Sequence, residues 1–177
     1  MHYAFQDKEN LYLVMDYLSG GELRDHLSAC DSFSEPLAKF FVGCLVLGLE
    51  YIHEHKIIHR DIKPENIVMD KHGYIRITDF GIARAWREEN AKDTSGTPGY
   101  MAPEVLRREK HSFAVDYFAL GVIAHELVLG CRPFTGRNRD EIRQCIDAKR
   151  VNIQPHHIPA GYSVHAGDFI NKVSKSD

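Results

Sequence analysis

Residues 57–81 read IIHRDIKPENIVMDKHGYIRITDFG, and no other stretch of the chain is as informative. Two short apolar runs, 67–69 and 74–77, flank the tetrapeptide DKHG at 70–73. An Asp-x-x-Gly sequence between two strand-like runs is typical of a tight β-hairpin. The stretch therefore predicts a hairpin over 67–77 whose two ends lie together.

Polar side chains stand at both ends of this predicted hairpin. Asp61 and Asn66 precede it and Asp79 follows it, so their side-chain oxygens should converge. Hard oxygen ligands with room for water suit Mg²⁺, which proteins hold with one or two carboxylates together with substrate phosphates. Lys63 adds a cation to the same place. The combination predicts a site for phosphoryl transfer.

The composition is that of an ordinary globular domain. The chain has 177 residues, 44% of them apolar and 27% charged, which is enough for one domain with its own core. A net charge of −3 gives no general attraction to nucleic acid. The four cysteines form no C-x-x-C pair, and with no signal peptide they indicate a reducing compartment, the cytoplasm or the nucleus. No apolar run is expected to span a membrane; the longest, 113–129, contains Asp116 and predicts a core helix.

The pattern of apolar residues predicts helices after an N-terminal pair of strands. The strands lie in 1–16 around a polar turn at 6–10, and the second, 11–15, is apolar throughout, which is typical of burial on both faces. An amphipathic helix should follow an N-cap at Ser34 and end near 53–56. Further helices are expected at 22–29, 102–108, 113–129, 137–149 and 163–173, with surface segments at 85–99 and 154–162.

Three motifs occur in the order and at the spacing of the eukaryotic protein kinase signature. They are HRDIKPEN at 59–66, DFG at 79–81 and APE at 102–104, and the chain resembles that family over nearly its whole length. Lys63, two residues after Asp61, and the tripeptide Gly-Thr-Pro at 96–98 resemble the corresponding residues of serine/threonine kinases more than those of tyrosine kinases. The stretches LYLVMDY at 11–17, SGGEL at 19–23 and DYFALG at 116–121 resemble the AGC group of these kinases.

The resemblance implies an α+β, protein-kinase-like fold that is mostly the helical C-lobe. Residues 1–18 would be a two-strand remnant of the N-lobe sheet with the hinge, and 19–177 a C-lobe without its last helices, so the catalytic domain would be truncated at both ends. The remnant would then expose an edge and Leu11, Leu13 and Met15. We expect the isolated chain to need a partner or to be poorly soluble, and to phosphorylate slowly or not at all.

The same resemblance implies roles for the polar residues. Asp61 would be the catalytic base that accepts the proton of the substrate hydroxyl, and Lys63 would steady the transferred phosphoryl group. Asn66 and Asp79 would hold Mg²⁺ for the donor, ATP. Thr97 resembles the threonine that ties the activation segment to Asp61 and Lys63.

Other residues would support the site or contact the nucleotide. His59 would pack with Phe80 inside the fold, Glu104 would pair with an arginine, and Asp116 would accept backbone N–H groups of the catalytic loop. In the adenine pocket Met15 would be the gatekeeper, although Met15 and Val68 are equally consistent with a plain core. The residues expected to contact ATP are Met15, Asp16, Leu18, Glu22, Val68 and Thr78.

Two further sets of residues suggest regulation and substrate choice. Arg60 resembles the arginine that pairs with a phosphate on the activation segment, and Asp93 stands at the AGC phosphorylation position, so it is either a weak mimic of that phosphate or the site has shifted to Thr94 or Ser95. Glu22, Glu65 and Glu126 resemble the acidic residues that in the AGC group read basic residues before the phosphoacceptor, which implies a preference for Arg or Lys upstream of Ser/Thr; the alternative is that they are ordinary structural glutamates.

The leading hypothesis is therefore a serine/threonine protein kinase, given as a fragment, that transfers the γ-phosphoryl group of ATP to a protein hydroxyl. The alternative is a non-catalytic, kinase-like scaffold, but such a scaffold has no chemical need for Asp61, Lys63, Asn66 and Asp79 together. A third possibility, some other Mg²⁺-dependent phosphotransferase, would not account for Ala-Pro-Glu at 102–104 or Gly-Thr-Pro at 96–98.

Overall fold

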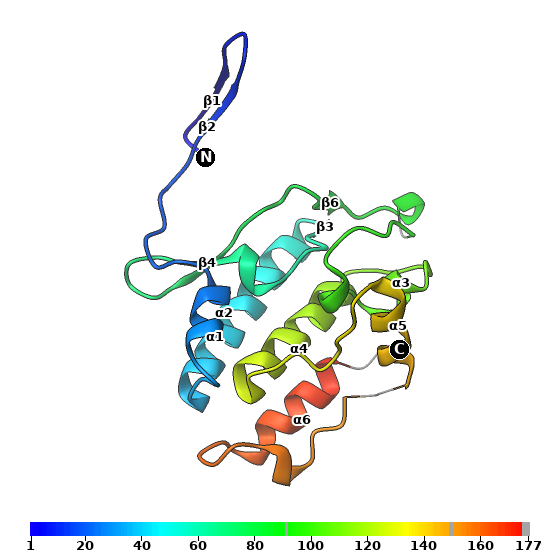
Figure 1. The fold of residues 1–177 in the computed structure, drawn as a ribbon. Helices are drawn as coiled ribbons and strands as arrows, with labels where there is room; N and C mark the ends of the chain where they lie inside the picture. Colours follow the sequence, from blue (N-terminus) through cyan, green and yellow to red (C-terminus); the bar gives the residue numbers. More distant parts are fainter. Residues whose placement is uncertain (91, 149–150, 175–177) are drawn as a thin grey trace.

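The computed structural model describes residues 1–90, 92–148 and 151–174. In these ranges the chain is mainly helical, with small two-stranded antiparallel sheets (Figure 1). The helices are α1 Leu23–Ala29, α2 Glu35–Glu54, α3 Pro103–Leu106, α4 Ala114–Leu129, α5 Arg139–Ala148 and α6 Val164–Val173. The strands are β1 Tyr3–Gln6, β2 Leu11–Val14, β3 Ile57–Ile58, β4 Ile67–Met69, β5 Ile75–Ile77 and β6 Arg84–Ala85, and 3₁₀ turns lie at η1 Pro64–Asn66, η2 Glu88–Asn90, η3 Pro98–Tyr100 and η4 Pro155–His157.

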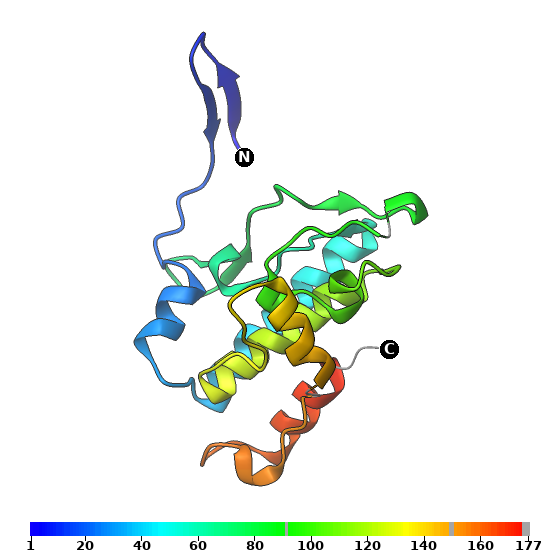
Figure 2. The same ribbon diagram turned by 45° about the vertical axis from the view of Figure 1, so that its right-hand side comes forward.

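Helix α4 is the centre of the core, as its apolar composition predicted. It is buried along almost its whole length and packs against α2 and α6 (Figures 1 and 2). The helix ends at Gly130, whose φ of 71° is left-handed. A Cβ atom at this position would lie 1.9 Å from the backbone oxygen of Asp31. The helix therefore has to stop at a glycine, which fixes where the following loop begins.

Helix α2 follows Ser34, as expected, but the hydroxyl of Ser34 makes no capping hydrogen bond. By length and composition α2 could cross a membrane, which corrects the expectation that no segment reaches that length. A core helix passes the same test, and α2 buries Ala38, Phe41, Leu45 and Leu49 against the core. Its other side is exposed and carries apolar side chains, among them Leu47 and Tyr51 at 66% and 64%, but the packing against α4 is that of a core helix.

A hydrogen-bonded carboxylate joins the start of α2 to the start of α6. Glu35 accepts hydrogen bonds from the backbone N and the Oγ of Ser163 at 2.9 and 2.6 Å, and its Oε1 lies 2.8 Å from Lys39 Nζ. Lys39 and then Ser163 lower the pKa of Glu35 to about 2. The contact holds α6 against the helical core at a point distant from residues 57–81.

The N-terminal hairpin β1–β2 extends away from the body of the molecule (Figures 1 and 2). Its pairing, from Tyr3 with Val14 to Gln6 with Leu11, confirms the two predicted strands. The prediction that the second strand is buried on both faces is wrong, because all of β2 is exposed. The expectation that Leu11, Leu13 and Met15 are exposed is confirmed, at 79%, 60% and 62%. The apolar composition of a strand indicates that it favours apolar surroundings, but it does not tell whether other elements of the chain provide them.

The predicted hairpin over 67–77 is confirmed as β4–β5, with Ile67 opposite Ile77. It docks onto the segment before α1, where the backbone N of Gly20 donates to Met69 O at 2.9 Å. A Cβ on Gly20 would lie 2.7 Å from Met69, so this close approach requires glycine. The hairpin and α1 thus form one unit that places η1, Pro64–Asn66, beside α1.

The other predicted elements are present with small differences. α3 is shorter than 102–108 because only Pro103–Leu106 is helical, and η4 lies inside the predicted loop 154–162. The expected end of α5 at residue 149 lies outside the described residues. Segment 85–99 was predicted at the surface, but it turns inward at its end, where Gly99 is buried beside Arg132.

Candidate active site

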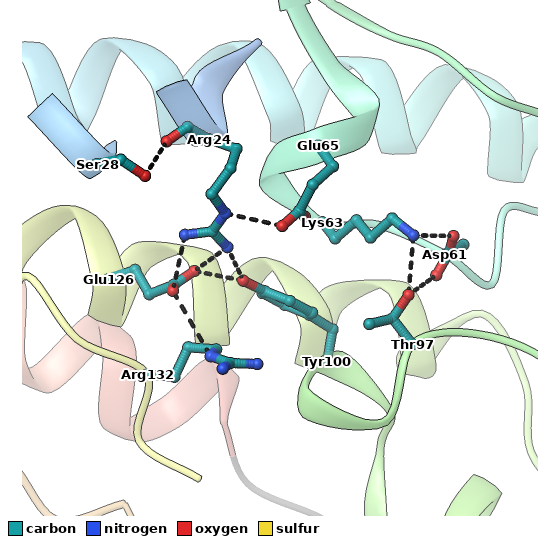
Figure 3. A network of polar contacts seen from close by, with 9 residues as sticks. All are labelled: Arg24, Ser28, Asp61, Lys63, Glu65, Thr97, Tyr100, Glu126 and Arg132. Atoms are coloured by element: carbon teal, nitrogen blue, oxygen red, sulfur yellow. Dashed lines mark hydrogen bonds and ion pairs between the residues drawn. The ribbon is translucent and has the colours of Figure 1, made fainter. Parts of the chain in front are cut away.

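Three side chains form a closed hydrogen-bonded group at the predicted catalytic position (Figure 3). Thr97 Oγ1 donates to Asp61 Oδ1 at 2.7 Å, and Lys63 Nζ donates to Thr97 Oγ1 at 2.9 Å. Lys63 Nζ also lies 2.8 Å from Asp61 Oδ2. Burial raises the pKa of Asp61, but the hydrogen bonds from Lys63 and Thr97 outweigh it, so the pKa is lowered overall. Asp61 is therefore an ionised carboxylate at neutral pH, held in a fixed orientation.

Asn66 links this carboxylate to the β4–β5 hairpin. Its Nδ2 donates to Asp61 O at 2.9 Å and to Asp61 Oδ2 at 3.1 Å, and its backbone oxygen accepts from Thr78 N at 2.8 Å. The two ends of the hairpin therefore meet, and Asp79 follows directly after Thr78. Asp79 has a left-handed φ of 57° and is exposed, with one oxygen accepting from Gly81 N at 3.1 Å.

This arrangement fits a magnesium ion. Asn66 uses its amide nitrogen on Asp61, which leaves its side-chain oxygen without a hydrogen bond in the described part of the chain. The exposed carboxylate of Asp79 would offer a second hard oxygen at the neighbouring strand end. An amide oxygen and a carboxylate oxygen are of the ligand types that Mg²⁺ accepts, together with phosphate and water.

A buried carboxylate fixes the loop that carries Asp61. Asp116 is 1% exposed and accepts from the backbone N atoms of His59 and Arg60 at 2.9 and 2.8 Å. His53 Nε2 lies 2.8 Å from the same carboxylate, on Oδ2. Three partners offset the cost of burying the charge, as a carboxylate in an apolar helix requires. They also hold Arg60 at a left-handed φ of 70°. His53 was not predicted, and its place in the last turn of α2 gave no signal for this contact.

His59 and Phe80 pack together, but only partly as expected. The ring of His59 is fully buried, its Nε2 lies 2.9 Å from Thr78 O, and its centroid is 4.9 Å from that of Phe80. Phe80 is 46% exposed: one side of its ring contacts His59, and the other is open. The expectation that Phe80 lies inside the fold is therefore wrong. No element among the described residues covers the open side. The carboxylate of Glu104 on α3, by contrast, makes no hydrogen bond or ion pair with a described residue, although its backbone oxygen accepts from Glu109 N at 2.8 Å.

The residues expected around ATP fall into two groups. Glu22 and Val68 meet through a backbone bridge, and Thr78 hydrogen-bonds to Asn66 O, so these three belong to the α1–hairpin unit. Met15, by contrast, is 62% exposed, so its interpretation as a core residue is wrong. Asp16 pairs with His2 of the N-terminal hairpin at 2.8 Å, and Leu18 is half-buried on the connection between the two units.

The residues expected to form the activation segment lie near Arg60. Arg60 Nη1 and Arg84 Nη1 lie 3.2 and 2.7 Å from the same oxygen of Asp93. Burial, followed by the charge of Arg84, lowers the pKa of Arg60. Thr94 and Ser95 are half-buried, and the backbone oxygen of Thr94 accepts from Arg139 at 3.3 Å.

The three glutamates proposed for substrate choice do not share one environment. The carboxylate of Glu22 is exposed and has no partner among the described residues. Glu65 and Glu126 are bound by Arg24, and Glu126 also by Tyr100 (Figure 3). Neither Arg24 nor Tyr100 was predicted. An arginine in a short surface helix gives no signal in the sequence that it turns inward.

We compared the chain with protein-family models and with known proteins. The family model described as "Protein kinase domain" matches residues 1–177. The cAMP-dependent protein kinase catalytic subunit of Dictyostelium discoideum is 39% identical over 100% of the chain and 26% of the relative. Ribosomal protein S6 kinase beta of Caenorhabditis elegans is 42% identical over 98% of the chain and 31% of the relative. Serine/threonine-protein kinase Sgk1 of Danio rerio is 40% identical over 88% and 36%. The chain spans about a third of the length of these relatives, which are AGC-type serine/threonine kinases.

Proposed function

The chain belongs to the protein kinase family, and from that premise we propose that it serves the transfer of the γ-phosphoryl group of ATP to serine or threonine hydroxyls of proteins. The observation that carries the proposal is the closed group of Asp61, Lys63 and Thr97. It brings a carboxylate, an ammonium and a threonine from segments 36 residues apart to one point.

Each member of the group has a chemical task in this proposal. Asp61 orients the acceptor hydroxyl and takes its proton as the oxygen attacks phosphorus, and its lowered pKa keeps it ionised for that purpose. Lys63 places a positive charge beside the transferred group. Asn66 and Asp79 would hold Mg²⁺, which when bound supplies charge neutralisation on the phosphates. Thr97 ties the activation segment to the base.

For regulation, we propose that Asp93 acts as a weak built-in substitute for an activating phosphate. Its contacts with Arg60 and Arg84 support this, because both arginines share one of its oxygens. An aspartate carries one charge where a phosphate carries nearly two. Phosphopeptide mapping that finds modification at Thr94 or Ser95 in the active protein would instead favour the shifted site.

For the acceptor sequence, we propose that Glu22 reads a basic residue before the phosphoacceptor. Its carboxylate is exposed, whereas Glu65 and Glu126 already bind Arg24. For location, we propose the cytoplasm or the nucleus. All four cysteines are free, which is the usual state in a reducing compartment.

The test uses the protein expressed from its complete coding sequence, with Mg²⁺, labelled ATP and a protein or peptide acceptor. Transfer to serine or threonine that is lost in Asp61→Asn, and nucleotide affinity that falls in Asp79→Asn, are the expected results. Exposed Asp140 supplies a matched control, Asp140→Asn, which should change neither. Nucleotide binding without transfer in every acceptor pool would favour the scaffold instead.

A further inference from the structure

The guanidinium of Arg24 is turned inward onto two carboxylates from distant parts of the chain (Figure 3). Its Nε donates to Glu65 Oε1 at 2.8 Å, and its Nη1 donates to Glu126 Oε1 at 3.3 Å. Its Nη2 donates to Glu126 Oε2 at 3.4 Å and to the hydroxyl of Tyr100. All three guanidinium nitrogens are therefore used, in the forked geometry by which arginine recognises carboxylates.

The two carboxylates form an anionic subsite, which we define as Glu65 and Glu126. The side chain of Glu126 is 7% exposed and that of Glu65 is 39% exposed, so the subsite is partly buried but has an open side. Tyr100 donates to Glu126 Oε2 at 2.6 Å. Arg132 Nε is 3.9 Å from Glu126 Oε1, which is too far for a hydrogen bond. Arg24 is thus the cation that closes the subsite.

One acceptor of the subsite has no donor. Glu65 Oε2 is buried and has no hydrogen-bond partner among the described residues. A buried carboxylate oxygen without a donor is costly, so the subsite lacks one N–H group that Arg24 does not provide. The guanidinium of an acceptor peptide would compete with Arg24 for the hydrogen bonds to Glu65 and Glu126, because Arg24 already occupies three of their four oxygens.

We propose that Arg24 is a specificity-determining residue that occupies the anionic subsite from within the chain, in the place where an arginine of an acceptor peptide would otherwise bind. The inference rests on the proposed kinase function for its biological meaning. Its consequence is that the Glu65–Glu126 subsite contributes nothing to a preference for basic substrates while Arg24 is present. Any preference of the wild-type protein for an upstream arginine comes from Glu22.

The local structure explains why Arg24 stays in this position. Leu23, its neighbour at the start of α1, is fully buried, and Glu22 is fixed by the bridge to Val68. Ser28 Oγ donates to Arg24 O at 2.9 Å, one turn later in the same helix. The helix is therefore held on both sides of Arg24, and the hydrogen bonds to Glu65 and Glu126 hold its side chain.

The experiment measures peptide binding, so that it does not depend on phosphoryl transfer. Fluorescent serine peptides carry one arginine at each upstream position in turn, and matched peptides carry citrulline, which has the same shape without the charge. The protein is again expressed from its complete coding sequence. Arg24→Ala and the milder Arg24→Gln open the subsite, and Arg143→Ala removes an exposed positive charge elsewhere as the matched control.

In Arg24→Ala we expect the ratio of arginine to citrulline affinity to rise about tenfold at one upstream position, since a hydrogen bond to a charged group is worth at least that factor. Adding Glu65→Gln should remove the gain, and Arg143→Ala should show none. In the wild-type protein Glu65→Gln should leave the ratio at every position unchanged.

Two results would overturn the proposal. One is a wild-type arginine preference that Glu65→Gln abolishes, because the subsite would then already be open to substrate; this measurement needs no Arg24 variant to fold. The other is a folded Arg24→Gln or Arg24→Ala protein with the wild-type ratio at all positions. If the protein binds peptides as predicted but transfers no phosphate, the kinase function fails and the role of Arg24 stands.

Discussion

Replacing Asp116 by asparagine should destabilise the catalytic loop by a predictable amount. In the wild-type protein Oδ2 accepts from His59 N and lies 2.8 Å from His53 Nε2, while Oδ1 accepts from Arg60 N. An asparagine has one oxygen and one NH₂ group. Its better orientation places the oxygen toward His59 and His53, so that the NH₂ group faces the N–H of Arg60, donor against donor.

The magnitude follows from that one orphaned donor. An unsatisfied buried N–H costs about 1–3 kcal/mol, and the loss of charge on the two remaining hydrogen bonds adds to it. We therefore expect the free energy of unfolding to fall by about 2–4 kcal/mol, a large share of the roughly 5–15 kcal/mol typical of a domain. Because Arg60 has a left-handed φ of 70° that this bond holds, its contact with Asp93 should weaken as well.

The assay is urea unfolding followed by circular dichroism, on the protein expressed from its complete coding sequence. Asp140→Asn is the control, because that side chain is 81% exposed, and a change within about 0.5 kcal/mol is expected there. Equal unfolding free energies for the two variants would refute the reasoning that Asp116 anchors the loop.

Further predictions concern three other residues. Thr97→Val should lower kcat about 10-fold or more with little loss of stability, since it removes a hydrogen bond to Asp61, the proposed base. Thr97→Ser should restore most of the lost kcat, and equal rates for both variants would contradict the role proposed for Thr97. Asp93→Ala should lower kcat, and Asp93→Glu should retain part of it, in the same steady-state assay; an unaffected Asp93→Ala enzyme would exclude the phosphate mimic. Glu35 has its pKa lowered from 4.5 to about 2 by Lys39 and Ser163, so its contribution to stability is complete above pH 4.5 and is lost as the pH falls toward 2. Thermal unfolding of Glu35→Gln should accordingly depend less steeply on pH in that window, and parallel wild-type and variant curves would show that the contact adds no stability.

The sequence predicted those parts of the fold in which neighbouring residues contain the whole signal. The β4–β5 hairpin was predicted from its Asp-x-x-Gly turn, and α4 from a run too apolar for a surface helix. The same reasoning failed for β2, where an apolar run predicted burial and the strand is exposed. Local sequence records a preference for apolar surroundings, but the surroundings belong to the tertiary structure.

The residues of the candidate site likewise divide into those that local sequence predicted and those that depend on tertiary contacts. Asp61, Asn66 and Asp79 lie within one hairpin and its flanks, so their convergence could be argued from the sequence, and Thr97 and Asp116 followed only from the family resemblance. His53, Tyr100 and Arg24 were missed because each acts through a partner far away in the chain, 63 residues away for His53 and 102 for Arg24 with Glu126. No periodicity or motif in a single sequence encodes such a pair.

The contacts of the catalytic group also show which part of the site is independent of the N-terminal hairpin. Asp61 is held by Lys63, Thr97 and Asn66, and its loop by Asp116, all of them in the helical body. The residues on the connection to β1–β2 make none of these contacts in the described chain. Substitutions at Met15 should therefore change the affinity for nucleotide without changing the geometry around Asp61. The proposed base and the proposed metal ligands are therefore positioned by contacts within the helical body.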